Sequence, residues 1–96
     1  MIYKNIFDSL EDCMHYHNGA TRTLTSQINS GKFGAVNSNI LAESSDTCIC
    51  NVTSGATCLL TPYINSNGYW CCLIYNCTDT SIVANTITIR FNVLRH

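Results

Sequence analysis

The sequence predicts a mainly β fold: a small β-sandwich or jelly-roll-like module of six or seven short strands, preceded by one amphipathic N-terminal helix. The clearest sign is residues 86–93, where Ile87, Ile89, Phe91 and Val93 alternate with polar residues. This period of two is typical of a strand with one buried face. Turn residues recur along the rest of the chain at the spacing of about 8–12 residues that short strands produce. A length of 96 residues allows one hydrophobic core at most.

The first 19 residues are expected to form the helix, and residues 20–96 the β module. Apolar residues recur at helical spacing on one side, with acidic residues on the other; the apolar set is Ile2, Ile6, Phe7, Leu10, Cys13 and Met14. Asn18-Gly19 suits the end of such a helix. Since an isolated helix this short is marginal in water, its stripe needs a cover. We predict an oligomer interface through Ile2, Ile6, Phe7, Leu10 and Met14.

The middle of the chain alternates short apolar segments with turn residues. A strand is expected over residues 20–28, and two short strands over 32–42, separated at Asn37-Ser38-Asn39. Residues 47–53 and 57–61 are interpreted as a hairpin. A two-residue turn at Ser54-Gly55 would divide the apolar residues of 57–61 between two faces. A three-residue turn, 54–56, gathers them on one face and is preferred.

That preferred register sets Val52 opposite Cys58, and Cys50 opposite Leu60. Pro62 lacks a backbone N–H, so it should lie at a strand end or on an edge strand. Asn65-Ser66-Asn67-Gly68 is the strongest turn signal in the chain. Residues 69–75 follow it as an unbroken apolar and aromatic run, which predicts a central strand buried on both faces.

The seven cysteines allow two interpretations. Their density approaches that of secreted disulfide scaffolds, and Asn51-Val52-Thr53 and Asn76-Cys77-Thr78 fit the N-glycosylation pattern. Their placement within apolar strands, however, suits reduced cysteine serving as a small hydrophobe. Cys48 and Cys50, for example, would share one face with Val52. Reduced thiols are the preferred interpretation, with one or more disulfides as the alternative.

Composition restricts the functional classes. Only 11% of residues are charged and the net charge is −1, so no basic patch predicts binding to nucleic acid or to an anionic membrane. No apolar run is long enough to span a bilayer, and the first 15 residues lack the apolar region of a signal peptide. No glycine-rich phosphate loop, nucleophile elbow or zinc-protease motif occurs. We therefore expect no enzymatic activity and no cofactor.

Two candidate sites remain. His15 and His17 would share a face on a strand and could ligate a metal, but on a helix they point apart. The helical interpretation disfavours metal, and neither Cys48-x-Cys50 nor the adjacent Cys71-Cys72 matches the C-x₂₋₄-C spacing of a zinc knuckle. Tyr63, Tyr69, Trp70 and Tyr75 cluster in sequence around the turn at 65–68 and are candidates for a sugar-stacking platform, although aromatic residues in a sandwich more often belong to the core.

Five segments of the second half carry a resemblance to a known class. They are Cys48-Ile-Cys-Asn-Val-Thr, Cys58-Leu-Leu-Thr-Pro62, Asn67-Gly-Tyr-Trp70, Ile87-Thr-Ile89 and Phe91-Asn-Val-Leu94. In this order they resemble the small C-terminal β-modules of tailed-bacteriophage fibre and adhesin proteins. The resemblance covers residues 47–94. It implies a non-enzymatic virion-surface protein: a head fibre, a decoration protein or a tail appendage.

What the resemblance implies fits the composition. A virion protein is made in the reducing host cytoplasm, where thiols stay free, and few charges make close packing of subunits easier. The expected partners are sister copies in a dimer or trimer, other virion proteins and a host cell-surface glycan. Two alternatives stay open: a secreted, disulfide-bonded glycoprotein module, and a carbohydrate-binding adhesin domain.

Overall fold

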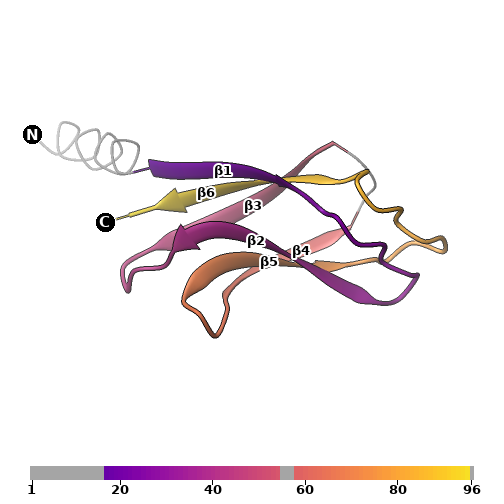
Figure 1. Ribbon diagram of the computed structural model, residues 1–96, viewed down its shortest axis with the longest axis horizontal. Coiled ribbons are helices and arrows are strands. Elements are labelled where there is room, and N and C mark those ends of the chain that lie inside the picture. The colour runs from indigo at the N-terminus through magenta and orange to yellow at the C-terminus, as the bar shows by residue number, and fades with distance from the viewer. Residues whose placement is uncertain (1–16, 55–57, 96) are drawn as a thin grey trace, which may run out of the picture.

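The computed structural model describes residues 17–54 and 58–95, which form two layers of β-sheet (Figure 1). The strands are β1 His17–Thr23, β2 Phe33–Leu41, β3 Thr47–Ser54, β4 Leu59–Ile64, β5 Tyr69–Tyr75 and β6 Thr88–Leu94. All pairings are antiparallel, and the two three-stranded sheets have the orders β1-β6-β3 and β2-β5-β4. The predicted mainly β class is confirmed.

Strand β6 is the centre of the first sheet and carries its buried row. Ile89, Phe91 and Val93 of this strand, and Ile87 just before it, have no exposed surface, whereas Arg90 is exposed. β1 and β3 pair with the two edges of β6, so the backbone groups of the strand are used on both sides. The structure therefore confirms both the predicted strand and the side of it that is buried.

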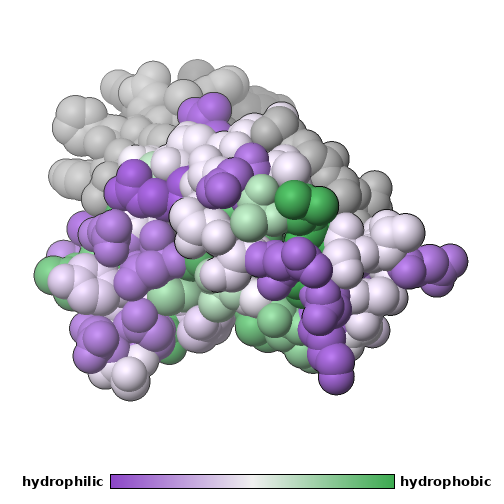
Figure 2. Space-filling view, turned by 45° about the vertical axis from the view of Figure 1, so that its right-hand side comes forward, coloured by the Kyte–Doolittle hydropathy of each residue, from purple (hydrophilic) through white to green (hydrophobic). Residues whose placement is uncertain are grey.

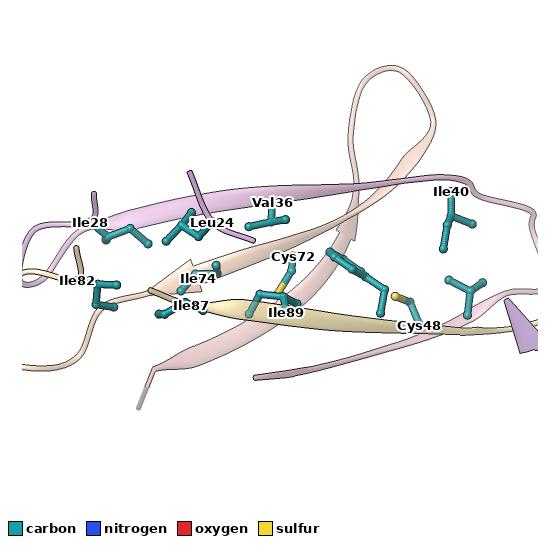
Figure 3. Close-up of a cluster of buried hydrophobic side chains, with 12 residues drawn as sticks. Leu24, Ile28, Val36, Ile40, Cys48, Cys72, Ile74, Ile82, Ile87 and Ile89 are labelled. Carbon is teal, nitrogen blue, oxygen red and sulfur yellow. The ribbon is translucent and has the colours of Figure 1, made fainter. Parts of the chain in front are cut away.

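The second sheet closes the core from the opposite side. Its central strand β5 contributes Cys72 and Ile74, both fully buried, and β2 contributes Val36 and Ile40. Figure 3 shows these side chains in the layer between the two sheets, together with Leu24 and other core residues. Neither sheet could bury its apolar row alone, because each row needs the other as its cover.

A glycine lets two segments approach closely at one end of this core. A Cβ atom at Gly34 would lie 2.5 Å from Cδ1 of Ile28, whose side chain is buried. Ile28 pairs with Ile82 in an isolated bridge rather than extending β1. The strand expected over residues 20–28 thus ends at Thr23, and the chain beyond it leaves the sheet.

Strand β2 is continuous where two short strands were expected. It contains a register shift between Asn37 and Leu41, and Asn39 has a φ of 63°. The side-chain Oδ1 of Asn37 accepts a hydrogen bond from the Asn39 backbone N–H (2.8 Å), and the Ser38 hydroxyl accepts one from the Ile40 N–H (3.0 Å). Asn tolerates this left-handed conformation, so the segment forms a bulge instead of a break.

The hairpin expected between residues 47–53 and 57–61 is wrong. β3 pairs with β6 and β4 pairs with β5, so the two segments lie in different sheets. The predicted face of β3 is nevertheless correct, because Cys48 and Cys50 lie opposite the buried Val93 and Phe91. An inward apolar row looks the same in sequence whether its partner lies beside it or across the core, which is why the pattern did not reveal the pairing.

The true hairpin joins β4 to β5 through the predicted turn at 65–68. The Gly68 N–H donates to the Asn65 carbonyl (3.0 Å), and the Asn65 side chain accepts from the N–H groups of Asn67 and Tyr69 (both 3.0 Å). Gly68 has a φ of 86°, which favours glycine. Pro62 lies on the edge strand β4, as expected for a residue without a backbone donor.

The predicted helix falls almost entirely on residues 1–16, which lie outside the described residues. Its expected end at Asn18-Gly19 is wrong, because β1 begins at His17 and pairs both residues with β6. Their backbone extends the first sheet, and sheet pairing overrides a local preference for a helix end. The β module therefore begins at least three residues before the expected boundary at residue 20.

We expect Phe91→Ala to lower the free energy of unfolding by roughly 3–5 kcal/mol, because it removes a fully buried aromatic ring from the centre of the first sheet. Urea-induced unfolding followed by Trp70 fluorescence measures this. Arg90→Ala, one residue away on the exposed face, should stay within about 0.5 kcal/mol of the wild type. Equal effects of the two substitutions would contradict the assigned orientation of β6.

Candidate functional site

The strongest polar cluster of the described residues is centred on Asp46, whose side chain has no exposed surface. Its carboxylate accepts hydrogen bonds from Arg95 Nε (2.9 Å), from an Arg95 terminal nitrogen (3.1 Å), from Trp70 Nε1 (3.0 Å) and from the Glu43 N–H (2.9 Å). Arg95 also donates to the Leu41 carbonyl (2.9 Å). The cluster ties the β2–β3 loop to the start of β5 and to the end of β6.

These contacts shift the pKa values of Asp46 and Arg95 so that both side chains favour their charged forms. The hydrogen bond from Arg95 holds the pKa of Asp46 well below its usual range, and the hydrogen bond to Asp46 raises the pKa of Arg95. Charged hydrogen bonds at these distances are the strong kind. The arrangement fixes three chain segments and leaves the carboxylate no exposed oxygen, so we interpret it as a structural clamp rather than a reaction centre.

A shallow groove of about 560 Å³ adjoins the clamp, between β1 and β2. The side chains Arg22, Glu43, Tyr69 and Arg95 line it. Arg22 crosses between the sheets, because its Nε donates to the Ser38 carbonyl of β2 (3.1 Å). The two arginines are balanced by the charges of Glu43 and the adjoining Asp46, so the groove presents no strong net charge to a ligand.

The outer face of the β2-β5-β4 sheet carries no charge and is largely apolar, and we name it the β5 face. The ladder register and side-chain alternation place nine residues on it: Phe33, Ala35, Asn37, Leu59, Thr61, Tyr63, Cys71, Leu73 and Tyr75. None is charged. Phe33 and Leu59 are 62% and 61% exposed, and the Phe33 ring packs on Tyr75 with centroids 4.8 Å apart.

The outer face of the β1-β6-β3 sheet has the opposite character, and we name it the β6 face. Its outward positions are Thr21, Thr23, Thr47, Ile49, Asn51, Thr53, Thr88, Arg90, Asn92 and Leu94. Polar residues therefore dominate this side. Figure 2 shows one view of the molecule in which purple and near-white residues predominate and green hydrophobic residues gather in a few patches. The two sheets thus share one core but present unlike outer surfaces.

The four aromatic residues proposed from the sequence divide between the two sides of the second sheet. Tyr63 and Tyr75 lie on the β5 face, and Tyr69 alternates with them along the same strand side as Cys71. Trp70 points the other way: it packs against the buried cluster and its indole N–H is bound to Asp46. The structure therefore places three tyrosines along one side of the second sheet and the tryptophan on the other.

Three cysteine side chains face the core from two different sheets. Cys48 and Cys50 face inward from β3, and Cys72 faces inward from β5. Figure 3 shows Cys48 and Cys72 in the layer between the two sheets. Each of the six cysteines in the described residues is free: Cys48, Cys50, Cys58, Cys71, Cys72 and Cys77.

Burial and the neighbouring thiols shift the pKa values of Cys48, Cys50 and Cys72 unequally. The bond to Cys50 and burial raise the pKa of Cys48. Cys50 accepts from Cys48, which lowers its pKa, but its own bond to Cys72 and burial outweigh this and raise the pKa of Cys50 to about 12. The bond from Cys50 lowers the pKa of Cys72, against the effect of burial. Cys72 is thus the most acidic of the three thiols.

Asn76 of the second predicted glycosylation motif is a structural residue. It has no exposed surface, and its amide nitrogen donates to the carbonyls of Ile28 (3.0 Å) and Thr80 (2.8 Å). Its amide oxygen accepts from the N–H and the hydroxyl of Thr78 (3.0 and 2.6 Å). The motif spacing that suggested a glycan acceptor therefore builds a turn after β5. Asn51 of the other motif lies on the exposed β6 face.

The remaining predicted sites are not placed by the structure. The interface residues Ile2, Ile6, Phe7, Leu10 and Met14, and the candidate ligand His15, lie outside the described residues. His17 begins β1. Within residues 17–54 and 58–95, no three histidine, cysteine or acidic side chains are arranged to hold a metal ion. In the same part of the chain, no helix has the length and apolar character to cross a bilayer.

Comparison of the chain with protein-family models, with curated proteins and with solved structures gives no match.

We expect Asp46→Asn to lower the free energy of unfolding by roughly 1–3 kcal/mol at pH 7, because charged hydrogen bonds at a shielded position are lost. The lowered pKa means that the folded state binds fewer protons than the unfolded state. The stability that Asp46 contributes is therefore fully present at pH values well above its ordinary pKa of 3.8. It is lost as the pH falls through the lowered pKa that Asp46 has in the folded state. Denaturant unfolding of both proteins from pH 7 to pH 2 measures the difference.

The matched control is Asp79→Asn, since Asp79 is exposed in the loop after β5. Its stability should remain within about 0.5 kcal/mol of the wild type. A difference between wild type and Asp46→Asn that stays constant as the medium is acidified would refute the clamp.

Proposed function

We propose that this chain is a non-enzymatic structural protein of the bacteriophage virion surface, a head fibre, decoration or tail-fibre component that assembles with sister copies. The observation that carries the proposal is the uncharged, apolar β5 face, set against a polar face on the other sheet. The resemblance of residues 47–94 to phage fibre and adhesin modules supports the virion assignment. Such a protein is made in the host cytoplasm and ends on the virion surface.

The β5 face is suited to packing against another protein. Large apolar side chains exposed side by side are costly in water, and contiguous apolar patches on soluble proteins mark interaction sites. Phe33, Tyr75 and Leu59 form one row across three strands, and Ala35, Leu73 and Thr61 form the next. A partner surface covers these side chains without having to neutralise any charge.

A second copy of the chain is the occupant that fits this face best. Two identical uncharged faces stack without like-charge repulsion, and a two-fold axis places the same apolar rows against each other. A charged partner would instead bury its own charges against a face that offers no counter-ion, which is costly. The same reasoning disfavours nucleic acid as a partner.

The area of the β5 face is too small to form a stable interface by itself. Seven residues of a strand extend roughly 23 Å and three strands cover roughly 14 Å, so one face measures roughly 300 Å². Two faces bury roughly 600 Å² in total, about half of the 1,200 Å² at which stable specific interfaces begin. A stable dimer or trimer needs more surface, and the sequence offers the apolar stripe Ile2, Ile6, Phe7, Leu10 and Met14 for it.

Two alternatives are less well supported. A secreted, disulfide-bonded glycoprotein would use its acceptor motifs and pair its cysteines, but Asn76 is buried and six cysteines are free. A carbohydrate-binding adhesin domain would use exposed aromatic rings. Tyr63 and Tyr75 lie on the β5 face, which a second copy would cover, so host-surface adhesion through these rings is an alternative to assembly through this face.

We expect the wild-type chain to sediment as a dimer or trimer of the 10.6 kDa protomer, and Leu59→Lys to shift it towards the monomer by at least tenfold in the dissociation constant. The lysine places a charge in the apolar row of Phe33, Tyr75 and Leu59 within each buried contact, where desolvation is costly. Sedimentation velocity over a range of protein concentrations measures the constant.

Ile49→Lys is the matched control, because Ile49 is an exposed apolar residue on the edge strand β3 of the opposite β6 face. It should leave the dissociation constant unchanged. A wild type that is monomeric at every concentration, or two variants that dissociate equally, would refute assembly through the β5 face.

A further inference from the structure

The shallow groove beside the Asp46 clamp, which we name the β1–β2 groove, lies next to the bulge in β2. β1 and β2 are edge strands of different sheets, and the groove of about 560 Å³ lies between them. The register of β2 with β5 shifts between Asn37 and Leu41, and Asn39 and Leu41 both line the groove. Its volume falls within the range of about 300–1,000 Å³ that is typical of small-molecule sites.

Two arginines occupy the backbone of β2 along this groove. The Nε–H of Arg22 donates to the Ser38 carbonyl (3.1 Å), and a terminal nitrogen of Arg95 donates to the Leu41 carbonyl (2.9 Å). These two carbonyls flank the bulge. A peptide strand that added to β2 here would have to displace both guanidinium groups, so the groove is poorly suited to a partner that extends the sheet.

The groove offers hydrogen-bond donors and acceptors together. Within the described residues, the Arg22 guanidinium has one other hydrogen bond, from Nη1 to the Thr21 carbonyl (3.4 Å), which leaves most of its five N–H groups for a ligand. Asn39 is exposed, and in the same part of the chain its carboxamide has no hydrogen-bond partner. The Glu43 carboxylate, 58% exposed, contacts Arg95 through Oε2, so Oε1 can accept a hydrogen bond.

The balance of charge around the groove favours a neutral ligand. Arg22 and Arg95 are matched by Glu43 and by the adjoining Asp46, and a bound ion would lose hydration without gaining a counter-charge. A sugar carries no charge, and each of its hydroxyls both donates and accepts. Tyr69 also lines the groove, and its aromatic ring offers the apolar surface on which the C–H face of a sugar packs.

We propose that the β1–β2 groove binds a neutral mono- or disaccharide. Arg22 and Asn39 donate to the sugar oxygens, Glu43 accepts from a sugar hydroxyl, and the ring of Tyr69 packs on the C–H face. Because Arg22 and Arg95 are already held by their bonds to β2, less conformational freedom is lost on binding. The groove shares no residue with the nine of the β5 face, so this inference does not rest on the proposed function.

The test uses the full chain, isotope-labelled for two-dimensional NMR, with four neutral disaccharides as probes: maltose, cellobiose, lactose and chitobiose. Each is raised to tens of millimolar. At least one of them should shift the backbone N–H signals of Asn39, Leu41 and Tyr69 and the Nε–H signal of Arg22, and the shifts should saturate in the millimolar range. The signal of Leu73 on the β5 face should not move. Sodium glucuronate and sodium sulfate, the charged probes, should bind more weakly.

Two asparagines give a matched pair of variants. Asn39 and Asn85 have φ values of 63° and 66°, and both are exposed. Glycine adopts this conformation readily, so both Asn→Gly substitutions should keep the fold. Asn39→Gly should raise the dissociation constant for the bound disaccharide at least threefold, whereas Asn85→Gly, outside the groove, should leave it unchanged. Tyr69→Ala should raise it at least tenfold, and Tyr63→Ala on the β5 face should not.

Three outcomes overturn the proposal. One is that none of the four disaccharides moves the groove signals. Another is a disaccharide that binds equally well to the wild type and to Asn39→Gly, or that loses affinity equally in Asn39→Gly and Asn85→Gly. The third is tighter binding of glucuronate or sulfate than of every neutral probe. The asparagine pair decides the result even if Tyr69→Ala fails to fold, and the sedimentation of Leu59→Lys tests the β5 face separately.

Discussion

Burial of the β6 row is the constraint on which the remaining structure depends. Ile87, Ile89, Phe91 and Val93 have no exposed surface, and a single sheet cannot hide them. β1 and β3 satisfy the backbone of β6 on both edges, and the second sheet covers its side chains. The chain crosses between the layers four times to achieve this, since β2, β4 and β5 lie in one sheet and β1, β3 and β6 in the other.

Because charged residues are scarce, few ionic contacts join the two sheets, and the outer faces of the sheets differ in polarity. Asp46 anchors the β2–β3 loop through Arg95 and Trp70, and Arg22 joins the sheets at their β1–β2 opening. Elsewhere the core relies on apolar and thiol packing. Because the polar residues gather on the β6 face, the β5 face is left apolar, and this difference between the two outer faces supports the proposal that copies assemble through the β5 face.

Cysteine has two physical roles in this fold. In the core it acts as a small hydrophobe that fills the space between sheets, as Cys48 and Cys72 do beside Val93 and Val36. The same placement turns cysteines from distant segments towards one core. Sequence spacing alone suggested hairpin neighbours for Cys50 on residues 57–61, whereas its neighbour in the sheet is Phe91 of β6. Partner choice in a sandwich is set by layer packing, which a one-dimensional pattern does not encode.

The sequence by itself determined the β class, the buried row of β6, the central position of β5, the inward face of β3 and the turn at 65–68, because each rests on side-chain period or on local turn chemistry. Only the tertiary structure decided that β3 and β4 belong to different sheets, that residues 37–39 form a bulge rather than a break, and that Trp70 faces away from the three tyrosines. These features depend on contacts between segments far apart in the chain. Local patterns are equally compatible with a neighbour in the same sheet and with one on the other side of the core, so packing of the two layers makes the choice.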